Sequence, residues 1–286
     1  MRSILFCMAL AGGVAAGASG PPTRIVSTAP SVTEMLFALG LGDRVVGVST
    51  FCNYPEQAKA IAKVGTFLRP DLETILALKP HLVILHNNPV PLAERLEKLG
   101  VRALELEHDS VAGIFEALHE VGAATGRAGQ AAALAAGLDR RLKTLRERAA
   151  KLPARRIMFV VGRNPGSLDG IVAVGRASYL NEIIEIAGGQ NIFRDSVAPY
   201  PSVSLEEILA RNPEVIVDMG DMAQTVGVTD DHKRMVVSLW SRQKRLSAVR
   251  NHAVFAVAAD IFVVPGPRVV EAAEAFARML HPEASF

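Results

Sequence analysis

Two glutamates occupy the same place in a segment that occurs twice in the sequence. DLETILALKPHLVIL begins at Asp71 and SLEEILARNPEVIVD begins at Ser204, and the acids that they share are Glu73 and Glu206. Asp and Ser are good helix N-caps, so both glutamates fall in the first turn of a predicted helix. The helix dipole alone favours an acid there, by about 0.3–1 kcal/mol. Alternatively, each copy presents one carboxylate to cations on a partner, through charge-assisted hydrogen bonds.

Residues that carry out catalysis or bind metals show no clustered pattern. The histidines are dispersed without a His-x-x-x-His pair, so no zinc site is encoded locally. GRNPGS lacks the Lys-Ser/Thr ending of a phosphate loop, and no Gly-x-Ser-x-Gly motif occurs. An enzyme such as a metal chelatase would need acids, histidines or thiolates gathered at a cleft, where we expect only His86, Asp260 and Cys52. The pattern favours a binding protein with no catalytic residue, metal or cofactor.

The N-terminus predicts export. MRSILFCMALAGGVAAGASG has one early positive charge, Arg2, then an apolar run and small residues, which is typical of a secretory signal peptide over residues 1–20. The apolar run is short for a membrane span. Removing this segment leaves Cys52 as the single cysteine, so no internal disulfide can form. We therefore expect an exported, disulfide-free protein of the bacterial periplasm.

Composition and element order predict a two-lobed α/β fold. The net charge is +2, with acids and bases interspersed, which argues against nucleic-acid binding. Continuous apolar strands alternate with helical segments in both halves, which indicates mainly parallel sheets covered by helices on both faces. An Ala-, Leu- and Arg-rich segment without proline separates the halves and predicts one long rigid helix. The predicted parts are an N-terminal lobe (22–126), a linking helix (127–152) and a C-terminal lobe (153–286).

Local signals also predict where strands lie and where helices begin. Ser31 and Glu34 form a possible capping box, as do Ser204 and Glu207. Pro267 is expected in the first turn of the last helix. The predicted strands lie at 24–28, 45–49, 81–87, 102–107, 155–161, 214–219 and 252–259.

Segments that follow the predicted strands are the candidate ligand site, because open α/β sheets bind ligands beyond the C-terminal ends of their strands. Tyr54 and Tyr200 lie in matching Asn-Tyr-Pro and Pro-Tyr-Pro settings and are expected on the walls of a cleft. Phe67 and Phe262 either line the same walls or belong to a lobe core. Asp260 either contacts ligand or caps the turn that follows it.

His86 follows an apolar strand at the expected edge of the cleft. It either coordinates a metal in the ligand or, as is more common for such a residue, hydrogen-bonds a loop backbone. The full set of candidate ligand-binding residues is Pro30, Tyr54, Phe67, His86, Tyr200, Asp260 and Phe262.

Several of these segments match a known family in order. RIVSTAPSVTEMLFALGLGDRVVGVSTFCNYPEQAKAIAKVGTFLRPDLETILALKPHLVIL, then GGQNIF, PYPSVSLEEILARNPEVIV and DIFVVPGPR, resemble the cobalamin-binding proteins of ABC importers, within the class III periplasmic binding proteins. The resemblance implies two lobes joined by a single helix and a cleft that holds cobalamin or another corrinoid. It also implies a monomer that docks one glutamate per lobe, here Glu73 and Glu206, onto arginines of an ABC permease dimer in the inner membrane.

Two departures from the relatives bear on the ligand. Cobalamin-binding clefts tend to use tryptophan, whereas Trp240 lies away from the matched segments. Haem-binding relatives tend to carry Tyr after Val-Gly, where this chain has Thr-Phe. A ferric siderophore is anionic and would need converging arginines, and Arg69, Arg163 and Arg268 lie near candidate loops. The leading prediction is a corrinoid receptor, with haem or a ferric siderophore as the alternative ligand.

Overall fold

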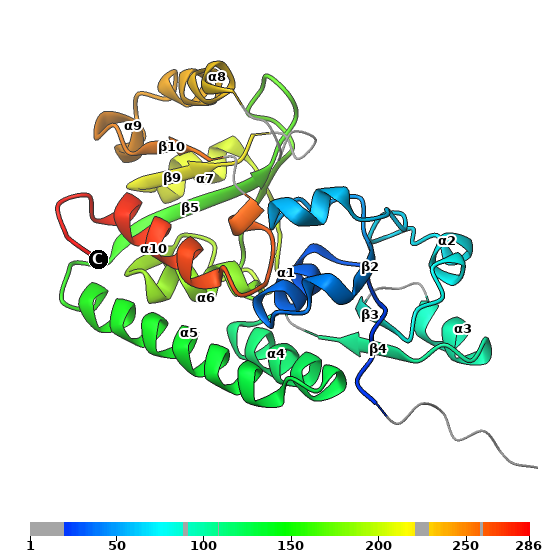
Figure 1. Ribbon diagram of the computed structural model, residues 1–286. Coiled ribbons are helices and arrows are strands. Elements are labelled where there is room, and N and C mark those ends of the chain that lie inside the picture. Colours follow the sequence, from blue (N-terminus) through cyan, green and yellow to red (C-terminus); the bar gives the residue numbers. More distant parts are fainter. Residues whose placement is uncertain (1–19, 88–90, 108, 221–228, 258–259) are drawn as a thin grey trace, which may run out of the picture.

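The computed structural model describes residues 20–87, 91–107, 109–220, 229–257 and 260–286 (Figure 1). The predicted signal peptide, apart from Gly20, lies outside the described residues. Among the helices that are described, none is both long enough and apolar enough to cross a bilayer.

A parallel sheet forms the centre of the N-terminal lobe. Its strand order is β2-β1-β3-β4, and the described pairings are parallel. The strands β1 and β3 are buried almost throughout, as expected for strands covered by helices on both faces. Because parallel strands share one direction, their C-terminal ends lie along the same edge of the sheet. The elements are β1 (Ile25–Ser27), α1 (Pro30–Ala38), η1 (Gly42–Arg44), β2 (Val45–Val48), η2 (Glu56–Ala60), α2 (Leu72–Ala77), β3 (Leu82–His86), α3 (Leu92–Lys98), β4 (Ala103–Leu106) and α4 (Val111–Thr125).

The sheet of the C-terminal lobe is mixed. Its order is β10-β9-β5-β6-β8, with β7 also paired to β5. The pairings among β10, β9, β5 and β7 are parallel, whereas β6 runs antiparallel to β5 and β8. The elements are β5 (Arg155–Gly162), β6 (Ile171–Ala173), α6 (Tyr179–Ile186), β7 (Gly189–Asn191), β8 (Ser202–Val203), α7 (Leu205–Arg211), β9 (Val215–Asp218), α8 (Asp230–Ser241), α9 (Ser247–Arg250), β10 (Val254–Ala256), η4 (Asp260–Phe262) and α10 (Val269–Leu280). The predicted α/β fold with two mainly parallel sheets is confirmed.

One long helix, α5 (Ala128–Ala149), follows the first sheet and precedes the second (Figure 1). It lies within the segment predicted as the linking helix. Leu138, Leu142 and Leu145 are buried on one face of α5, at the spacing of an amphipathic helix. This face packs against α4 and α10, and Arg141 pairs with Glu274 of α10 at 2.7 Å. The helix is therefore supported along its length rather than spanning open solvent.

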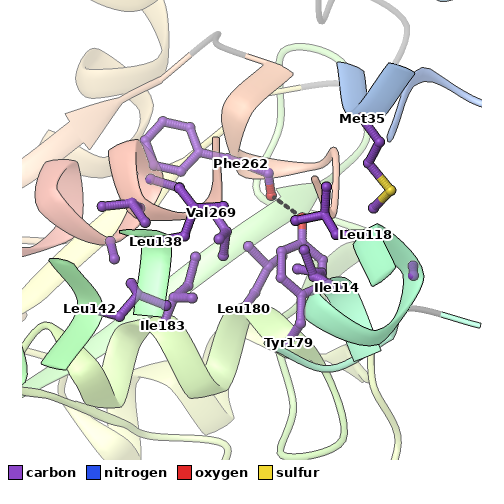
Figure 2. Packing of buried hydrophobic residues seen from close by; sticks show 14 of the residues in the cluster. Met35, Ile114, Leu118, Leu138, Leu142, Tyr179, Leu180, Ile183, Phe262 and Val269 are labelled. Carbon is purple, nitrogen blue, oxygen red and sulfur yellow. Dashed lines mark hydrogen bonds between the residues drawn. The ribbon is translucent and has the colours of Figure 1, made fainter. Parts of the chain in front are cut away.

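The two lobes share one continuous apolar core. In Figure 2, Met35 of α1 and Leu118 of α4 lie beside Tyr179 and Leu180 of α6, and Val269 of α10 belongs to the same cluster. All five side chains are buried. Burying one such side chain contributes about 1.5–3 kcal/mol. This shared core fixes how the lobes are placed relative to each other.

Two of the predicted helix starts are wrong. α1 begins at Pro30 with Ala29 as its N-cap, because proline's fixed φ suits the first helical position. The predicted capping box of Ser31 and Glu34 therefore does not form, and the Glu34 side chain is buried instead. α10 begins at Val269, so Pro267 precedes the helix rather than lying in its first turn.

The aromatic cluster in the core offers a test of this packing. Phe276 is fully buried, and its ring centroid lies 5.3 Å from that of Phe159 and 5.2 Å from that of Phe262. Phe276→Ala should lower the free energy of unfolding by about 3–5 kcal/mol, because it leaves a cavity. Urea unfolding followed by circular dichroism measures this. Phe51→Ala, where the ring is 57% exposed, is the matched control, with an expected change within about 0.5 kcal/mol. Equal losses in both variants would contradict the assignment of Phe276 to the core.

Candidate functional site

A cavity of about 930 Å³ lies between the two lobes. Its volume is near the upper end of the roughly 300–1,000 Å³ that is usual for small-molecule sites, which suits a large ligand. Its lining is mainly apolar with a few polar groups, which is also the usual character of such sites. The lining residues are Ala29, Pro30, Ser31, Phe51, Thr66, Phe67, Leu68, Arg69, His86, Asp109, Ala177, Ser178, Tyr179, Pro199, Tyr200, Val263, Val264 and Pro265.

The N-terminal lobe contributes the chain that follows its strands. Ala29 comes just after β1, Phe51 after β2 and Asp109 after β4, and His86 is the last residue of β3. The prediction that the cleft lies beyond the C-terminal ends of the strands is confirmed for this lobe. In a parallel sheet these ends meet at one edge, which brings residues far apart in the sequence to a single wall.

Phe67 is carried by a tight loop. Gly65 and Pro70 form an isolated bridge that closes the loop, and Gly65 has φ +89°. A Cβ at Gly65 would lie 2.4 Å from the backbone oxygen of Arg69, so only glycine fits there. The Phe67 ring lies 5.2 Å from the His86 ring, between centroids. The loop therefore places one aromatic face against another at the cavity wall.

His86 is a partly buried member of this wall. Its Nε2 lies 3.4 Å from Oδ1 of Asp109. Burial lowers the pKa of His86, and the nearby carboxylates of Asp109 and Glu107 oppose that change only in part. The imidazole is therefore mainly neutral at neutral pH, the form in which histidine can bind a metal.

The C-terminal lobe contributes two tyrosines held by hydrogen bonds. The Ser178 hydroxyl accepts from the N–H of Leu180 as the N-cap of α6, and it donates to the phenol oxygen of Tyr200 at 3.2 Å. The Tyr179 hydroxyl donates to the carbonyl of Phe262 at 3.2 Å. Burial raises the pKa of both phenols, so both stay protonated at neutral pH. The side chains at this wall are thus fixed before any ligand arrives.

Four of the predicted ligand-binding residues, Pro30, Phe67, His86 and Tyr200, line the cavity. Their contact with a ligand stays a prediction. Tyr54 is 46% exposed and lies three residues after the lining residue Phe51, with its ring beneath the Arg268 guanidinium.

Of the two positions expected for Phe262, its side chain takes the one in the core and does not line the cavity. Its side chain is only 3% exposed and packs edge-on against Phe159 and Phe276. It is the backbone of Phe262 that reaches toward the cavity wall, by accepting the hydrogen bond from Tyr179. Asp260 is absent from the lining residues of the cavity, and its carboxylate accepts from Arg268 Nη1 at 2.9 Å.

The three arginines weighed as an anion site have separate positions. Arg163 is buried and donates to Asp218 at 2.9 Å, and Asp218 also accepts from Trp240 at 2.6 Å. Arg268 is buried and paired with carboxylates. Only Arg69 of the three is a lining residue of the described cavity. The arginines therefore do not converge on the cavity.

Glu34 is an important residue that sequence reasoning misplaced. Its side chain is 4% exposed and receives hydrogen bonds from Nε and Nη2 of Arg268, the former at 2.9 Å. Burial raises the pKa of Glu34 to about 6, although the hydrogen bonds from Arg268 act to lower it. For Arg268, burial acts to lower the pKa, but the hydrogen bonds to Glu34 and Asp260 outweigh it and raise the pKa.

Other lining residues were not singled out from the sequence. Phe51 and Leu68 are exposed apolar side chains at the cavity, and each lies in a loop that was expected to contribute other residues. Tyr179 begins helix α6, and Asp109 follows β4. The available signal was position, since Phe51 and Asp109 follow strands and Tyr179 begins a helix, whereas Leu68 lies in the loop before α2.

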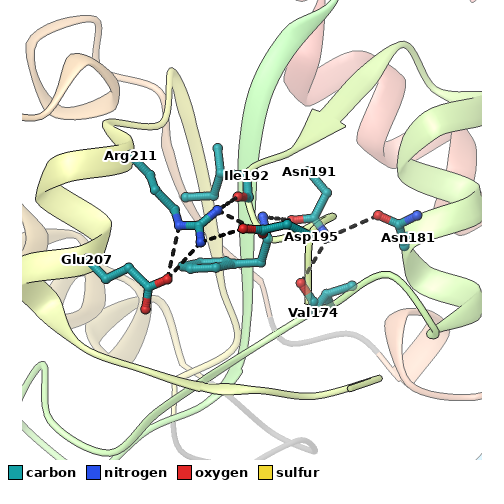
Figure 3. Close-up of polar contacts among 8 residues, drawn as sticks. Val174, Asn181, Asn191, Ile192, Asp195, Glu207 and Arg211 are labelled. Atoms are coloured by element: carbon teal, nitrogen blue, oxygen red, sulfur yellow. Dashed lines mark hydrogen bonds and ion pairs between the residues drawn. The ribbon is translucent and has the colours of Figure 1, made fainter. Parts of the chain in front are cut away.

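The helices that carry Glu73 and Glu206 have the same local structure, and both acids are exposed. The Asp71 and Ser204 side chains cap α2 and α7, as predicted. Near the end of each helix one residue has a positive φ: Lys79 (φ 48°) follows the C-cap of α2, and Asn212 (φ 44°) is the C-cap of α7. Figure 3 shows how α7 is held: Arg211 bonds Asp195 at 2.9 Å, Glu207, and the carbonyl of Ile192. Of the two hydrogen bonds in the predicted Ser204–Glu207 capping box, the one from the Glu207 N–H to the Ser204 hydroxyl forms. The Glu207 carboxylate instead accepts from Arg211.

An arginine near the start of β1 or β5 donates a hydrogen bond to a backbone carbonyl at the C-terminal end of each of these helices. Nε of Arg24 donates to the carbonyl of Leu78 at 3.0 Å, and Nη1 of Arg156 donates to the carbonyl of Arg211 at 3.1 Å. The duplicated sequence thus corresponds to a duplicated structural unit, which presents one carboxylate in each lobe.

No group of three or more His, Cys, Asp and Glu side chains within the described ranges is placed to hold a metal ion.

Comparison with known proteins agrees with the fold. The periplasmic binding protein family matches residues 25–260. The chain belongs to this family. The vitamin B12-binding protein of Vibrio cholerae serotype O1 is 34% identical over 260 residues, which cover 89% of this chain and 87% of that protein. The family resemblance found in the sequence is thereby confirmed.

Solved structures of the family are similar along most of their length. The periplasmic vitamin B12 binding protein BtuF of Vibrio cholerae superposes with a TM-score of 0.73 at 31% identity, covering 92% of this chain and 98% of that one. The periplasmic haem-binding protein RhuT from Roseiflexus sp. RS-1 has a TM-score of 0.75 at 25% identity, covering 90% and 98%.

The raised pKa of Glu34 predicts a pH dependence of stability. Between pH 4.5 and about 6 the unfolded carboxyl loses its proton before the folded one, so this contribution falls as pH rises. The full loss is about 2 kcal/mol, and most of it falls between pH 4.5 and 7. Glu34→Gln cannot titrate, so the stability difference between the parent and this variant should change by most of that amount over this range. Urea unfolding at pH 4.5, 5, 6 and 7 measures it, with the exposed Glu120→Gln as control. Parallel pH profiles for parent and Glu34→Gln would contradict the shifted pKa.

Proposed function

We propose that this chain is a periplasmic receptor that captures cobalamin or a related corrinoid and delivers it to an ABC permease dimer in the inner membrane. The observation that carries the proposal is the large cavity between the lobes, in a chain 34% identical to a vitamin B12-binding protein over 89% of its length. The corrinoid is transported cargo rather than a cofactor. Capture and delivery depend on complementarity, so the cycle needs no catalytic residue.

The wall chemistry supports a broad, largely uncharged ligand. Phe51, Phe67 and Tyr200 offer aromatic surface from both lobes. Aromatic faces bury a large area of a flat ring, and a phenol hydroxyl can meet the amide side chains at its edge. These groups are already held in place by the fold, which lowers the entropic cost of binding.

Charge favours a corrinoid over a ferric siderophore. A siderophore is anionic and is best bound by several arginines, but Arg163 and Arg268 are each paired with carboxylates. Arg69 is the cation of these three that lines the cavity. Haem is the second candidate, favoured by the presence of His86 at the wall, because haem iron needs an axial ligand such as histidine.

The remaining assignments follow from this proposal. Residues 1–20 direct export as a signal peptide, and the mature chain acts as a monomer in the periplasm. Residues 22–126 and 153–286 form the two lobes that hold the ligand, and residues 127–152 link them.

Titration of the purified protein with cyanocobalamin, cobinamide, haemin and a ferric hydroxamate siderophore tests the ligand. Isothermal calorimetry should show saturable 1:1 binding of the two corrinoids and at least about tenfold weaker binding of the others. Tight haemin binding with a Soret shift that His86→Ala removes would instead identify haem.

Tyr200→Ala should weaken corrinoid binding by about tenfold or more, whereas Tyr200→Phe keeps the ring and should lose less affinity. Tyr54→Ala should also weaken binding, and unchanged affinity in both alanine variants would show that the site lies elsewhere.

Delivery requires a contact with the permease, and we propose Glu73 and Glu206 for it. Both acids are exposed at equivalent positions on helices held by arginine contacts to the backbone. Two rigidly held carboxylates suit a two-fold symmetric partner with one arginine group per subunit.

Reversing both charges tests docking separately from capture. Glu73→Arg with Glu206→Arg should abolish corrinoid uptake in cells that depend on this protein, because both contacts become repulsive. Corrinoid affinity of the purified double variant should stay within about twofold of the parent. Glu120→Arg with Glu147→Arg reverses two other exposed acids and should preserve uptake. Parent-like uptake by the Glu73/Glu206 variant would exclude the docking role.

A further inference from the structure

Arg268 belongs to the C-terminal lobe, but several of its contacts are with the N-terminal lobe. Its Nε donates to Glu34 of α1 at 2.9 Å, and its Nη2 donates to the other carboxylate oxygen. Its guanidinium carbon lies 3.9 Å above the centre of the Tyr54 ring. Its remaining Nη1 donates to Asp260 of its own lobe at 2.9 Å. One side chain therefore contacts two elements of the facing lobe.

Burial makes this contact costly to break. Arg268 is 9% exposed and Glu34 is 4% exposed, so water cannot easily replace either partner. Removing one member of such a pair leaves a buried charge without compensation, which is strongly destabilising. The two parallel bonds also fix the orientation of the guanidinium, which a lysine ammonium could not do.

The pair lies beside the cavity rather than within the shared apolar core. Glu34 is on α1, whose first residues Pro30 and Ser31 line the cavity. On the other side, Pro265 lines the cavity three residues before Arg268. A Cβ at Gly266 would lie 3.3 Å from the Glu34 carboxylate, so the loop and α1 are closely packed.

We propose that Arg268 is a positioning residue that holds the two lobes at their separation beside the cavity and orients Tyr54. The Glu34 pair resists separation of the lobes where ligand must leave, while the apolar core of α4, α5, α6 and α10 holds them elsewhere. The stack on Tyr54 limits the orientations of that ring. Loss of Arg268 therefore increases lobe motion and speeds ligand release. The release effect rests on the proposed function, whereas the effect on lobe separation does not.

Distances between spin labels test the lobe effect without ligand. Labels on Glu97→Cys in α3 and Ser241→Cys in α8 report on opposite lobes, and both residues are exposed. The buried Cys52 is replaced by Ser in this background. Arg268→Met should broaden the inter-label distance distribution measured by pulsed electron paramagnetic resonance. Glu34→Gln should broaden it similarly, and Arg268→Lys should give an intermediate width because it keeps the charge but loses the parallel bonds.

Arg163→Met is the matched control. Arg163 is also buried and also pairs with a carboxylate at 2.9 Å, but its partner Asp218 is in the same lobe. This variant should lose stability while keeping the narrow distance distribution of the parent. Broadening by Arg163→Met equal to that by Arg268→Met would overturn the proposal, because a general loss of stability would then explain both. A parent-like distribution in Arg268→Met and Glu34→Gln would also overturn it.

Ligand release gives the functional readout. Stopped-flow displacement of cyanocobalamin should be at least about tenfold faster in Arg268→Met and Glu34→Gln, and within about twofold of the parent in Arg163→Met. Unchanged release in the first two variants, with the parent binding normally, would overturn the role of Arg268 in ligand retention. Failure of the parent to bind cyanocobalamin would reject the corrinoid assignment, and the distance measurement would still decide whether Arg268 sets the lobe separation.

Discussion

The apolar core shared by the two lobes is the constraint on which the site depends. A cavity between two sheets exists only if the edges of those sheets are held at a fixed separation, and neither sheet can do this alone. Residues of α1 and α4 on one side pack against α6 and α10 on the other, with α5 along both. Because packed interiors are dense and resist deformation, the cavity is largely preformed. Its shape can then discriminate among large ligands without a major rearrangement on binding.

The buried arginines of this protein are paired with carboxylates, because burying an unpaired charge costs free energy. Arginines close to a low-dielectric site must find carboxylates or remain in water. Arg268 pairs with Glu34 and Asp260, and Arg163 pairs with Asp218. The cavity is left with aromatic and aliphatic walls and little uncompensated charge. Such walls distinguish a neutral macrocycle from a polyanion more effectively than the fold does, because members of this family with very similar folds are named for different ligands.

Local sequence signals predicted most of the fold and part of the site. Short apolar runs gave the strands, and Asp71 and Ser204 marked helix starts, because these signals act over a few residues. The rule for strand ends located His86 at the cavity, whereas Phe67 and Tyr200 line it from the loops before α2 and β8. The Glu34–Arg268 pair could not be predicted, because its partners are 234 residues apart and each had a plausible local explanation. Phe262 could not be assigned to the core or to the cavity wall beforehand, because an apolar residue in a loop has the same sequence signal whether it faces a core or a cleft.

The duplicated helix unit holds Glu73 and Glu206 in fixed positions, which bears on their proposed role in docking. An exposed carboxylate on a flexible segment loses entropy when it meets an arginine, which offsets much of the gain from the pair. Here each acid is in the first turn of a capped helix, and Arg24 or Arg156 bonds the carbonyl at the other end of that helix. The two arginines lie at the start of the central strands, so each helix is fixed to its sheet. The shared core then fixes one sheet relative to the other, which sets the distance between Glu73 and Glu206. A partner with two cationic sites at that spacing could bind both acids without reorganising either lobe, and any change in lobe separation beside Arg268 would alter the match. Under the proposed function, ligand retention and partner recognition would both depend on this inter-lobe geometry.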